Sequence, residues 1–176
     1  GEMAIVGNTV LDNLTDVEVT TEKCVLVTMH RRENQHSIAE WFQEIDKVAA
    51  KYHDYEFLLP IHPNPAVRQY QHLFKHVKVV EPLGHTELVA YLAKCTFVIT
   101  DSGGVQEESA FLDKPCLVCR KETERTEGLG NFSLLCEEPS LLLQRVEELK
   151  GLPMRGPCPY GEGDSAKRIV KILEEM

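Results

Sequence analysis

The feature that most constrains this chain is a regular alternation of short apolar runs with segments of helical periodicity. The apolar runs are rich in β-branched and aromatic residues and are apolar throughout, which is typical of strands buried on both faces of a parallel sheet. The predicted strands span residues 25–28, 56–61, 77–80, 97–100, 116–118 and 132–135. The predicted helices span residues 38–52, 67–74, 86–93, 106–112 and 140–149, and a last helix starts at residue 165.

This order of elements predicts an α/β fold, a doubly wound, Rossmann-like parallel sheet of about six strands with right-handed crossovers. Ser37 and Glu40 have the spacing of a capping box at the start of the first helix, and Ser165 is a candidate cap for the last. A chain of 176 residues supports a single domain, here residues 1–176. Because such sheets bind ligands at the carboxyl ends of their strands, the residues that follow each strand are the candidate site.

Composition excludes several classes of protein. With 19 basic and 28 acidic residues, the net charge of −9 argues against a nucleic-acid partner. The apolar runs are far shorter than the roughly 20 residues that cross a bilayer, and the chain opens on no signal peptide, so we expect no membrane partner and a cytoplasmic location. Six cysteines are too few for a disulfide scaffold. Cys116 and Cys119 would point to opposite faces of one strand, which predicts core thiols and no metal site.

Two predicted strands are followed by histidines. The first leads into His30 and Arg31, where an arginine can hold phosphate oxygens bidentately and a histidine can donate or shuttle a proton. The second leads into His62, which lies in a turn stiffened by two prolines. The alternative interpretations are a solvated charged loop for the first segment and a purely structural turn for the second.

A third strand end has the most specific pattern. Ser102, Gly103 and Gly104 precede a predicted helix, where two glycines let backbone N–H groups approach a ligand and the helix start offers unpaired donors. This pattern predicts a phosphate cradle, and the carboxylate of Glu108, about one turn further along, could accept hydrogen bonds from a ribose diol. The alternative is a plain tight turn with a helix cap.

A mixed-charge segment, residues 120–125, follows the fifth predicted strand. Its basic residues, Arg125 among them, could close over a diphosphate that arrives from the glycine side. Such a charge run is also common as an ordinary solvated surface.

Together and in this order, these motifs closely resemble the carboxyl-terminal half of the non-hydrolysing UDP-N-acetylglucosamine 2-epimerases. The resemblance covers essentially the whole chain. The matching segments are residues 7–12, 28–34, 62–67, 100–108, 123–125 and 159–163.

The resemblance implies a site and an architecture. Ser102, Gly103 and Gly104 would hold phosphate oxygens, Glu108 the ribose hydroxyls and Arg125 the diphosphate, with His30 matching the active-site histidine. Arg31 and His62 join these as substrate-binding candidates, and no cofactor is implied. The family has two Rossmann-like domains that face a cleft in the glycosyltransferase-B arrangement. Leu88 stands where the family commonly has an aromatic residue near the uracil, and residues 125–132 look shorter and richer in glycine than usual.

The implied reaction interconverts UDP-N-acetylglucosamine and UDP-N-acetylmannosamine by elimination and re-addition of UDP. The proton-transfer carboxylates of the family belong to an amino-terminal domain that this chain lacks, so we expect the chain alone to bind UDP and to be inactive. The full enzyme is expected to be a homodimer. Two alternatives remain open, the donor-binding half of a glycosyltransferase and a non-catalytic nucleotide-binding or docking module.

Overall fold

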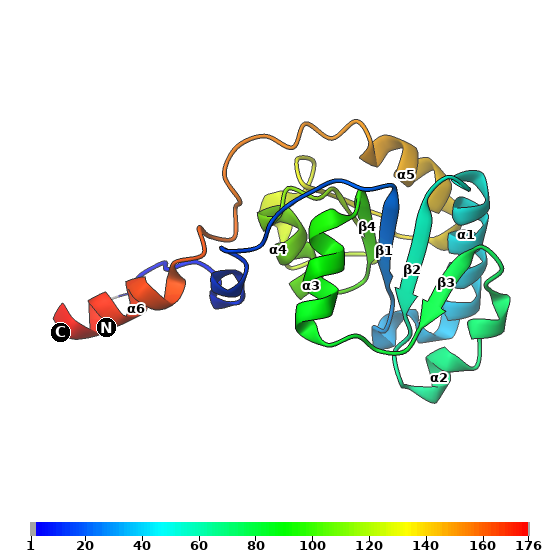
Figure 1. Cartoon of the computed structure of the whole chain (residues 1–176), viewed down its shortest axis with the longest axis horizontal. Coiled ribbons are helices and arrows are strands. Elements are labelled where there is room, and N and C mark those ends of the chain that lie inside the picture. The colour runs from blue at the N-terminus through cyan, green and yellow to red at the C-terminus, as the bar shows by residue number, and fades with distance from the viewer. Residues whose placement is uncertain (1–2, 176) are drawn as a thin grey trace.

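The computed structural model describes residues 3–175, and its centre is a six-stranded, all-parallel sheet in the order β3-β2-β1-β4-β5-β6 (Figure 1). The sheet confirms the predicted doubly wound α/β fold. The chain builds outward from β1 to β3 and then returns to the other side of β1 with β4, so the winding direction reverses between β1 and β4. The strands are β1 Cys24–Thr28, β2 Glu56–Pro60, β3 Val77–Val80, β4 Phe97–Thr100, β5 Cys116–Val118 and β6 Ser133–Leu135.

Helices cover both faces of this sheet, which explains why its strands are apolar throughout. Val25 and Val27 of β1 pack into a core with α1 (Ile38–Lys51) and α5 (Leu142–Leu149). Leu26, between them, packs into a second core with residues of α3 (His85–Lys94) and α4 (Gly103–Phe111). Because consecutive side chains of a strand point to opposite faces, a doubly covered strand must be apolar at every position. No helix within residues 3–175 is both long and apolar enough to cross a membrane.

The segment predicted as one helix over residues 67–74 is instead two shorter elements. The first is α2 (Pro65–Arg68), which starts early because the side chain of Asn64 accepts the N–H of Ala66 and because proline suits the first helical position. A short 3-10 helix, Gln71–Leu73, follows. The chain then turns so that the ring of Phe74 packs against Phe42 of α1, with centroids 4.6 Å apart. Tertiary packing therefore overrides the local helical pattern.

Ser37 lies at the N-cap of α1, as predicted, but the capping box with Glu40 does not form there, and the predicted cap at Ser165 is wrong. Ser37 makes no capping bond, because a 3-10 helix (Arg32–Ser37) runs directly into α1 and such turns can satisfy the first amides of a helix. At the start of α6 (Ser165–Glu175), the amides of Ser165 and Ala166 donate to the carboxylate of Asp12, at 3.0 and 2.7 Å. The cap of the last helix thus comes from the opposite end of the chain.

These Asp12 bonds hold the first and last segments of the chain side by side, away from the sheet (Figure 1). The N–H of Asn8 also donates to the carbonyl of Tyr160 at 2.8 Å. As a result, the segment around Tyr160 passes close to α4, and its phenol donates to the backbone carbonyl of Arg125 at 3.1 Å. The chain ends therefore help to fix the loop that carries Arg125.

Candidate functional site

The predicted site residues that follow β1 and β4 meet at the position where the winding of the sheet reverses. β1 leads into His30 and Arg31, and β4 leads into Asp101 and Ser102. Asp101 is fully buried, and its carboxylate accepts the backbone N–H of His30 at 3.0 and 3.1 Å and that of Arg31 at 2.8 Å. The amide of Asn34 donates to the same carboxylate at 3.1 Å. Asp101 therefore ties the two strand ends together.

Asp101 is a functional residue that the sequence analysis missed. The sequence shows an acidic residue directly after a predicted strand, but only the structure shows that it is buried, and a buried carboxylate needs donors. The side chain of Arg31 adds a further link, since its Nε donates to the carbonyl of Asp101 at 3.2 Å. The loop after β1 is thus held through one carboxylate and one carbonyl of the loop after β4.

The two predicted histidines also come together. The imidazole rings of His30 and His62 are stacked, with centroids 5.3 Å apart and planes 12° from parallel. His62 is oriented by its own turn, because its Nδ1 accepts the N–H of Asn64 at 3.1 Å. The side chain of His30 is 38% exposed, so the pair presents polar ring edges at the carboxyl end of the sheet. Such a pair can donate to an anion or move a proton.

The glycine pattern forms the first turn of α4, three residues earlier than predicted. Ser102 is the N-cap, and its hydroxyl lies 3.5 Å from the N–H of Val105 while its own N–H donates to Thr100 Oγ1 at 2.9 Å. Gly103 and Gly104 follow as the first two helical residues. Their amides belong to the group that has no partner within the helix. The turn is therefore both a capped helix start and a potential anion site.

Gly103 allows Arg125 to lie against the start of this helix. A Cβ at position 103 would be 2.8 Å from Cζ of Arg125, whereas one at Gly104 would be 3.9 Å from its nearest neighbour, the Ser102 hydroxyl. The guanidinium of Arg125 is oriented by Glu107, whose carboxylate is 2.6 Å from Nε. The predicted cradle and the predicted arginine are thus in contact.

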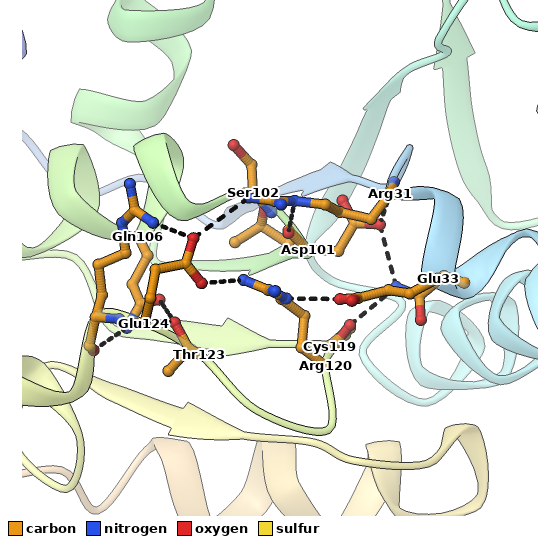
Figure 2. A network of polar contacts seen from close by, with 12 residues as sticks. Arg31, Glu33, Asp101, Ser102, Gln106, Cys119, Arg120, Thr123 and Glu124 are labelled. Atoms are coloured by element: carbon orange, nitrogen blue, oxygen red, sulfur yellow. Dashed lines mark hydrogen bonds and ion pairs between the residues drawn. The ribbon is translucent and has the colours of Figure 1, made fainter.

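Two further arginines approach the same place (Figure 2). The carboxylate of Glu124 pairs with Arg125, lies 2.7 Å from Arg120 and 3.9 Å from Arg31. A bond to its own backbone N–H, followed by the Arg120 guanidinium, lowers the pKa of Glu124 to about 2. The three guanidiniums therefore surround a carboxylate of the chain itself. Because Arg120 also pairs with Glu33 at 2.6 Å and Arg125 with Glu107, an anion would bind to this cluster by displacing a carboxylate.

The loop that carries Arg125 is fastened to α4 by a buried glutamine. The amide nitrogen of Gln106 donates to the carbonyl of Arg125 at 2.9 Å and to Ser133 Oγ at 3.1 Å. Its amide oxygen accepts the hydroxyl proton of Thr123, also at 2.9 Å. Gln106 was another missed residue, because its role depends on partners in β6 and in a loop. It keeps Arg125 over the helix start.

Glu108 lies on the side of α4 that faces α3. Its side chain is 6% exposed, and His85 at the start of α3 places Nε2 3.1 Å from its carboxylate. Burial raises the pKa of Glu108, and the bond to His85 opposes that rise. His85 also lines a cavity of about 480 Å³, together with Asn13 and Val89. Glu108 therefore belongs to a second pair beside the arginine cluster.

None of the predicted site residues lines the cavity of about 600 Å³ that lies between α1 and the segment around Pro139. Cys116 and Cys119 belong to the cores on opposite faces of the sheet, as predicted.

Across residues 3–175, no three histidine, cysteine or acidic side chains are grouped so that they could hold a metal ion. Proton transfer and anion binding are the chemistry that these residues offer.

Comparisons with known proteins identify the family of this chain. The family described as UDP-N-acetylglucosamine 2-epimerase matches residues 2–174. The UDP-N-acetylglucosamine 2-epimerase of Bacillus subtilis is 34% identical over 195 residues, which cover 96% of this chain and 51% of that protein. The corresponding Escherichia coli K12 protein is 34% identical over 170 residues, covering 87% of this chain and 44% of its own length.

Solved structures show the same relationship. The UDP-GlcNAc 2-epimerase from Neisseria meningitidis bound to UDP-GlcNAc aligns with a TM-score of 0.84 at 29% identity, over 98% of this chain and 55% of its own. S. aureus MnaA in a co-structure with UDP aligns with a TM-score of 0.84 at 28% identity, over 97% and 52%. The chain spans about half the length of these relatives. It belongs to the UDP-N-acetylglucosamine 2-epimerase family.

Proposed function

We propose that this chain is the UDP-binding half of a UDP-N-acetylglucosamine 2-epimerase, which interconverts UDP-N-acetylglucosamine and UDP-N-acetylmannosamine. The observation that carries the proposal is the contact between Arg125 and the glycine-opened start of α4, at the point where the winding of the sheet reverses. Open α/β sheets bind their ligands at this point, and a helix start beside an arginine is suited to phosphate. The relatives solved with UDP-GlcNAc and with UDP support this class of ligand.

In this proposal the diphosphate lies on the amides of Gly103 and Gly104, within reach of the Ser102 hydroxyl. Arg125 and Arg31 contribute charge from the neighbouring loops. Each group is held before the ligand arrives: Arg125 by Glu107 and Arg31 by Asp101. Donors that are fixed in advance stabilise a departing diphosphate without being reoriented during the reaction.

The two ends of the nucleotide sugar then extend in opposite directions. Glu108, buried on the α3 side, accepts the ribose hydroxyls. His30 and His62, stacked at the end of β1 and β2, lie toward the sugar. In the reaction, a base removes the proton from C2 while the bond from C1 to UDP breaks, which leaves an unsaturated sugar. Return of a proton to the opposite face and re-addition of UDP complete the inversion.

The groups that move the C2 proton belong, in this proposal, to an amino-terminal domain in the glycosyltransferase-B arrangement. We infer that the complete enzyme is a homodimer, that residues 1–176 form its UDP-binding domain, and that this domain alone is inactive. A cytoplasmic location is supported by the six cysteines, none of which is paired. The two-fold difference in length from the relatives supports the two-domain architecture.

Titration calorimetry with UDP tests the binding part of the proposal. We expect heat on titration, and weaker binding after Ser102→Ala and Arg125→Ala. Absence of heat at millimolar UDP would leave only a docking role. The complementary domain is then added: UDP-N-acetylmannosamine formed without an acceptor supports the epimerase, whereas UDP release that depends on an acceptor indicates a glycosyltransferase. Epimerisation by this chain alone would contradict the division of labour.

A further inference from the structure

The carboxylate that is proposed to accept the ribose hydroxyls is contacted from a second helix. Glu108 on α4 and His85 on α3 are 3.1 Å apart, carboxylate oxygen to Nε2. The carboxylate side chain is 6% exposed, while the imidazole is 54% exposed. Among the described residues, His85 is the only side chain that bonds to this carboxylate. One protein donor therefore decides how a nearly buried acid is oriented.

A buried acid without such a donor would be a poor partner for a diol. Burial favours the protonated form of Glu108, and the neighbouring carboxylate of Glu107 acts in the same direction. A protonated acid loses part of its acceptor capacity, whereas an ionised one can accept from two hydroxyl groups. His85 opposes both effects and leaves one oxygen edge for a ligand.

The position of the pair fits a ribose. Glu108 follows Gly103 by five residues on the same helix, which corresponds to about 7.5 Å along its axis at 1.5 Å per residue. This is the scale of the separation between a diphosphate and the ribose hydroxyls of the same nucleotide. On the other side, His85 lines the cavity of about 480 Å³ beside α3. His85 therefore borders both Glu108 and this cavity.

We propose that His85 is a positioning residue that holds Glu108 as the ribose acceptor and so makes this site selective for ribonucleotides over 2′-deoxyribonucleotides. The inference rests on the proposed UDP site and adds a residue that determines its specificity. His85 itself is placed by the start of α3, where the N–H of Gly84 donates to Glu87 at 3.0 Å. The backbone of His85 thus lies at the start of its own helix, while its ring contacts the next helix.

Calorimetry with UDP and with 2′-deoxy-UDP tests the inference. We expect the unaltered chain to bind UDP roughly tenfold more tightly than 2′-deoxy-UDP, the effect of one hydrogen bond to a charged group. His85→Leu removes the donor and should bring this ratio close to one. His85→Gln keeps a donor and should retain most of the preference. His72→Leu, the same change at an exposed histidine whose ring bonds to the backbone carbonyl of Gln69, is the matched control and should leave the ratio unchanged.

The outcomes separate the two proposals. If UDP does not bind at all, the proposed function fails and the inference fails with it. If UDP binds and Glu108→Gln abolishes the preference while His85→Leu does not, the ribose role of Glu108 stands and the inference about His85 is wrong. A His85→Leu variant that weakens both ligands equally, with the ratio intact, assigns His85 a merely structural role. Thermal melting of each variant confirms that it is folded.

Discussion

Asp101 accepts the backbone N–H of His30 with both carboxylate oxygens, at 3.1 and 3.0 Å, although the two residues are 71 positions apart. The contact joins the end of β4 to the end of β1, the two strands between which the sheet changes direction. It places the candidate active-site histidine through its main chain, and the His30 ring, whose Nδ1 lies 3.6 Å from the same carboxylate, stacks on His62. The geometry of the site therefore depends on a residue that is itself shielded from any ligand.

Replacing this carboxylate tests how much the site depends on it. Asp101→Asn leaves one oxygen and adds two N–H donors where three donors already converge, so at least one buried N–H loses its partner. We expect the free energy of unfolding to fall by about 1–3 kcal/mol and UDP binding to weaken. Urea denaturation and calorimetry measure the two effects. Asp54→Asn, which alters an exposed pair with Lys23, is the control and should change stability little. Equal effects of the two variants would contradict the role of Asp101.

The two glycines of the cradle should respond differently to alanine. Gly103→Ala places a Cβ within 2.8 Å of the Arg125 guanidinium, so the arginine must move away from the helix start. Gly104→Ala meets no atom closer than 3.9 Å and removes backbone freedom from the unfolded chain. We expect Gly104→Ala to leave the free protein as stable or up to about 1 kcal/mol more stable, and Gly103→Ala to destabilise it relative to Gly104→Ala.

Denaturation of both variants without ligand measures this difference. A Gly103→Ala protein as stable as Gly104→Ala, with Arg125 still bonded to Glu107 in a crystal structure, would show that the close approach is not needed.

In the proposed site, the carboxylate of Glu124 would compete with a bound diphosphate in the arginine cluster. It contacts Arg31, Arg120 and Arg125, and an incoming anion must take over some of these contacts. Glu124→Gln removes the negative charge and retains the shape of the side chain. We expect UDP to bind several-fold more tightly to this variant, with a steeper dependence on salt. Calorimetry at two ionic strengths measures both quantities, and weaker binding would show instead that Glu124 is needed to assemble the cluster.

Glu108 should make the ligand-free protein less stable as the pH rises. Its pKa is raised above the ordinary value of 4.5, chiefly by burial. In the interval above 4.5 the unfolded chain releases this proton before the folded chain does, so raising the pH favours unfolding. Glu108→Gln cannot ionise. We therefore expect it to be more stable than the unaltered chain at neutral pH, with the difference shrinking as the pH falls below about 4.5.

Urea denaturation between pH 4 and pH 7 tests this expectation. Glu108→Gln should raise the stability of the His85→Leu chain more than that of the unaltered chain, because His85 is the partner that favours the ionised carboxylate. A Glu108→Gln protein that is less stable than the unaltered chain at neutral pH would contradict the inference that burying the ionised Glu108 costs folding free energy.

The fold, and the end of the sheet at which the candidate site residues meet, could be predicted because both depend on local patterns. A strand such as Val25–Val27 is apolar at every position because helices cover both faces of the sheet, and this is visible in a few consecutive letters. The reversal of winding at β1 then brings the residues after β1 and β4 together. For this reason His30, His62 and the Ser102 turn could be placed at one edge before any contact was known.

What the tertiary structure alone decided is the set of partners. Asp12 caps a helix that begins 153 residues later, Asp101 fixes the loop of His30, and His85 reaches Glu108 from another helix. The periodicity of apolar residues indicates which face of an element is buried. It does not indicate which distant residue will be the hydrogen-bond partner of a polar group. A buried carboxylate or amide forms hydrogen bonds with the groups that the packing of the whole sheet brings within about 3 Å. The sequence by itself thus determined the framework and the end of the strands at which the candidate residues lie, while three-dimensional packing determined how each of these residues is held.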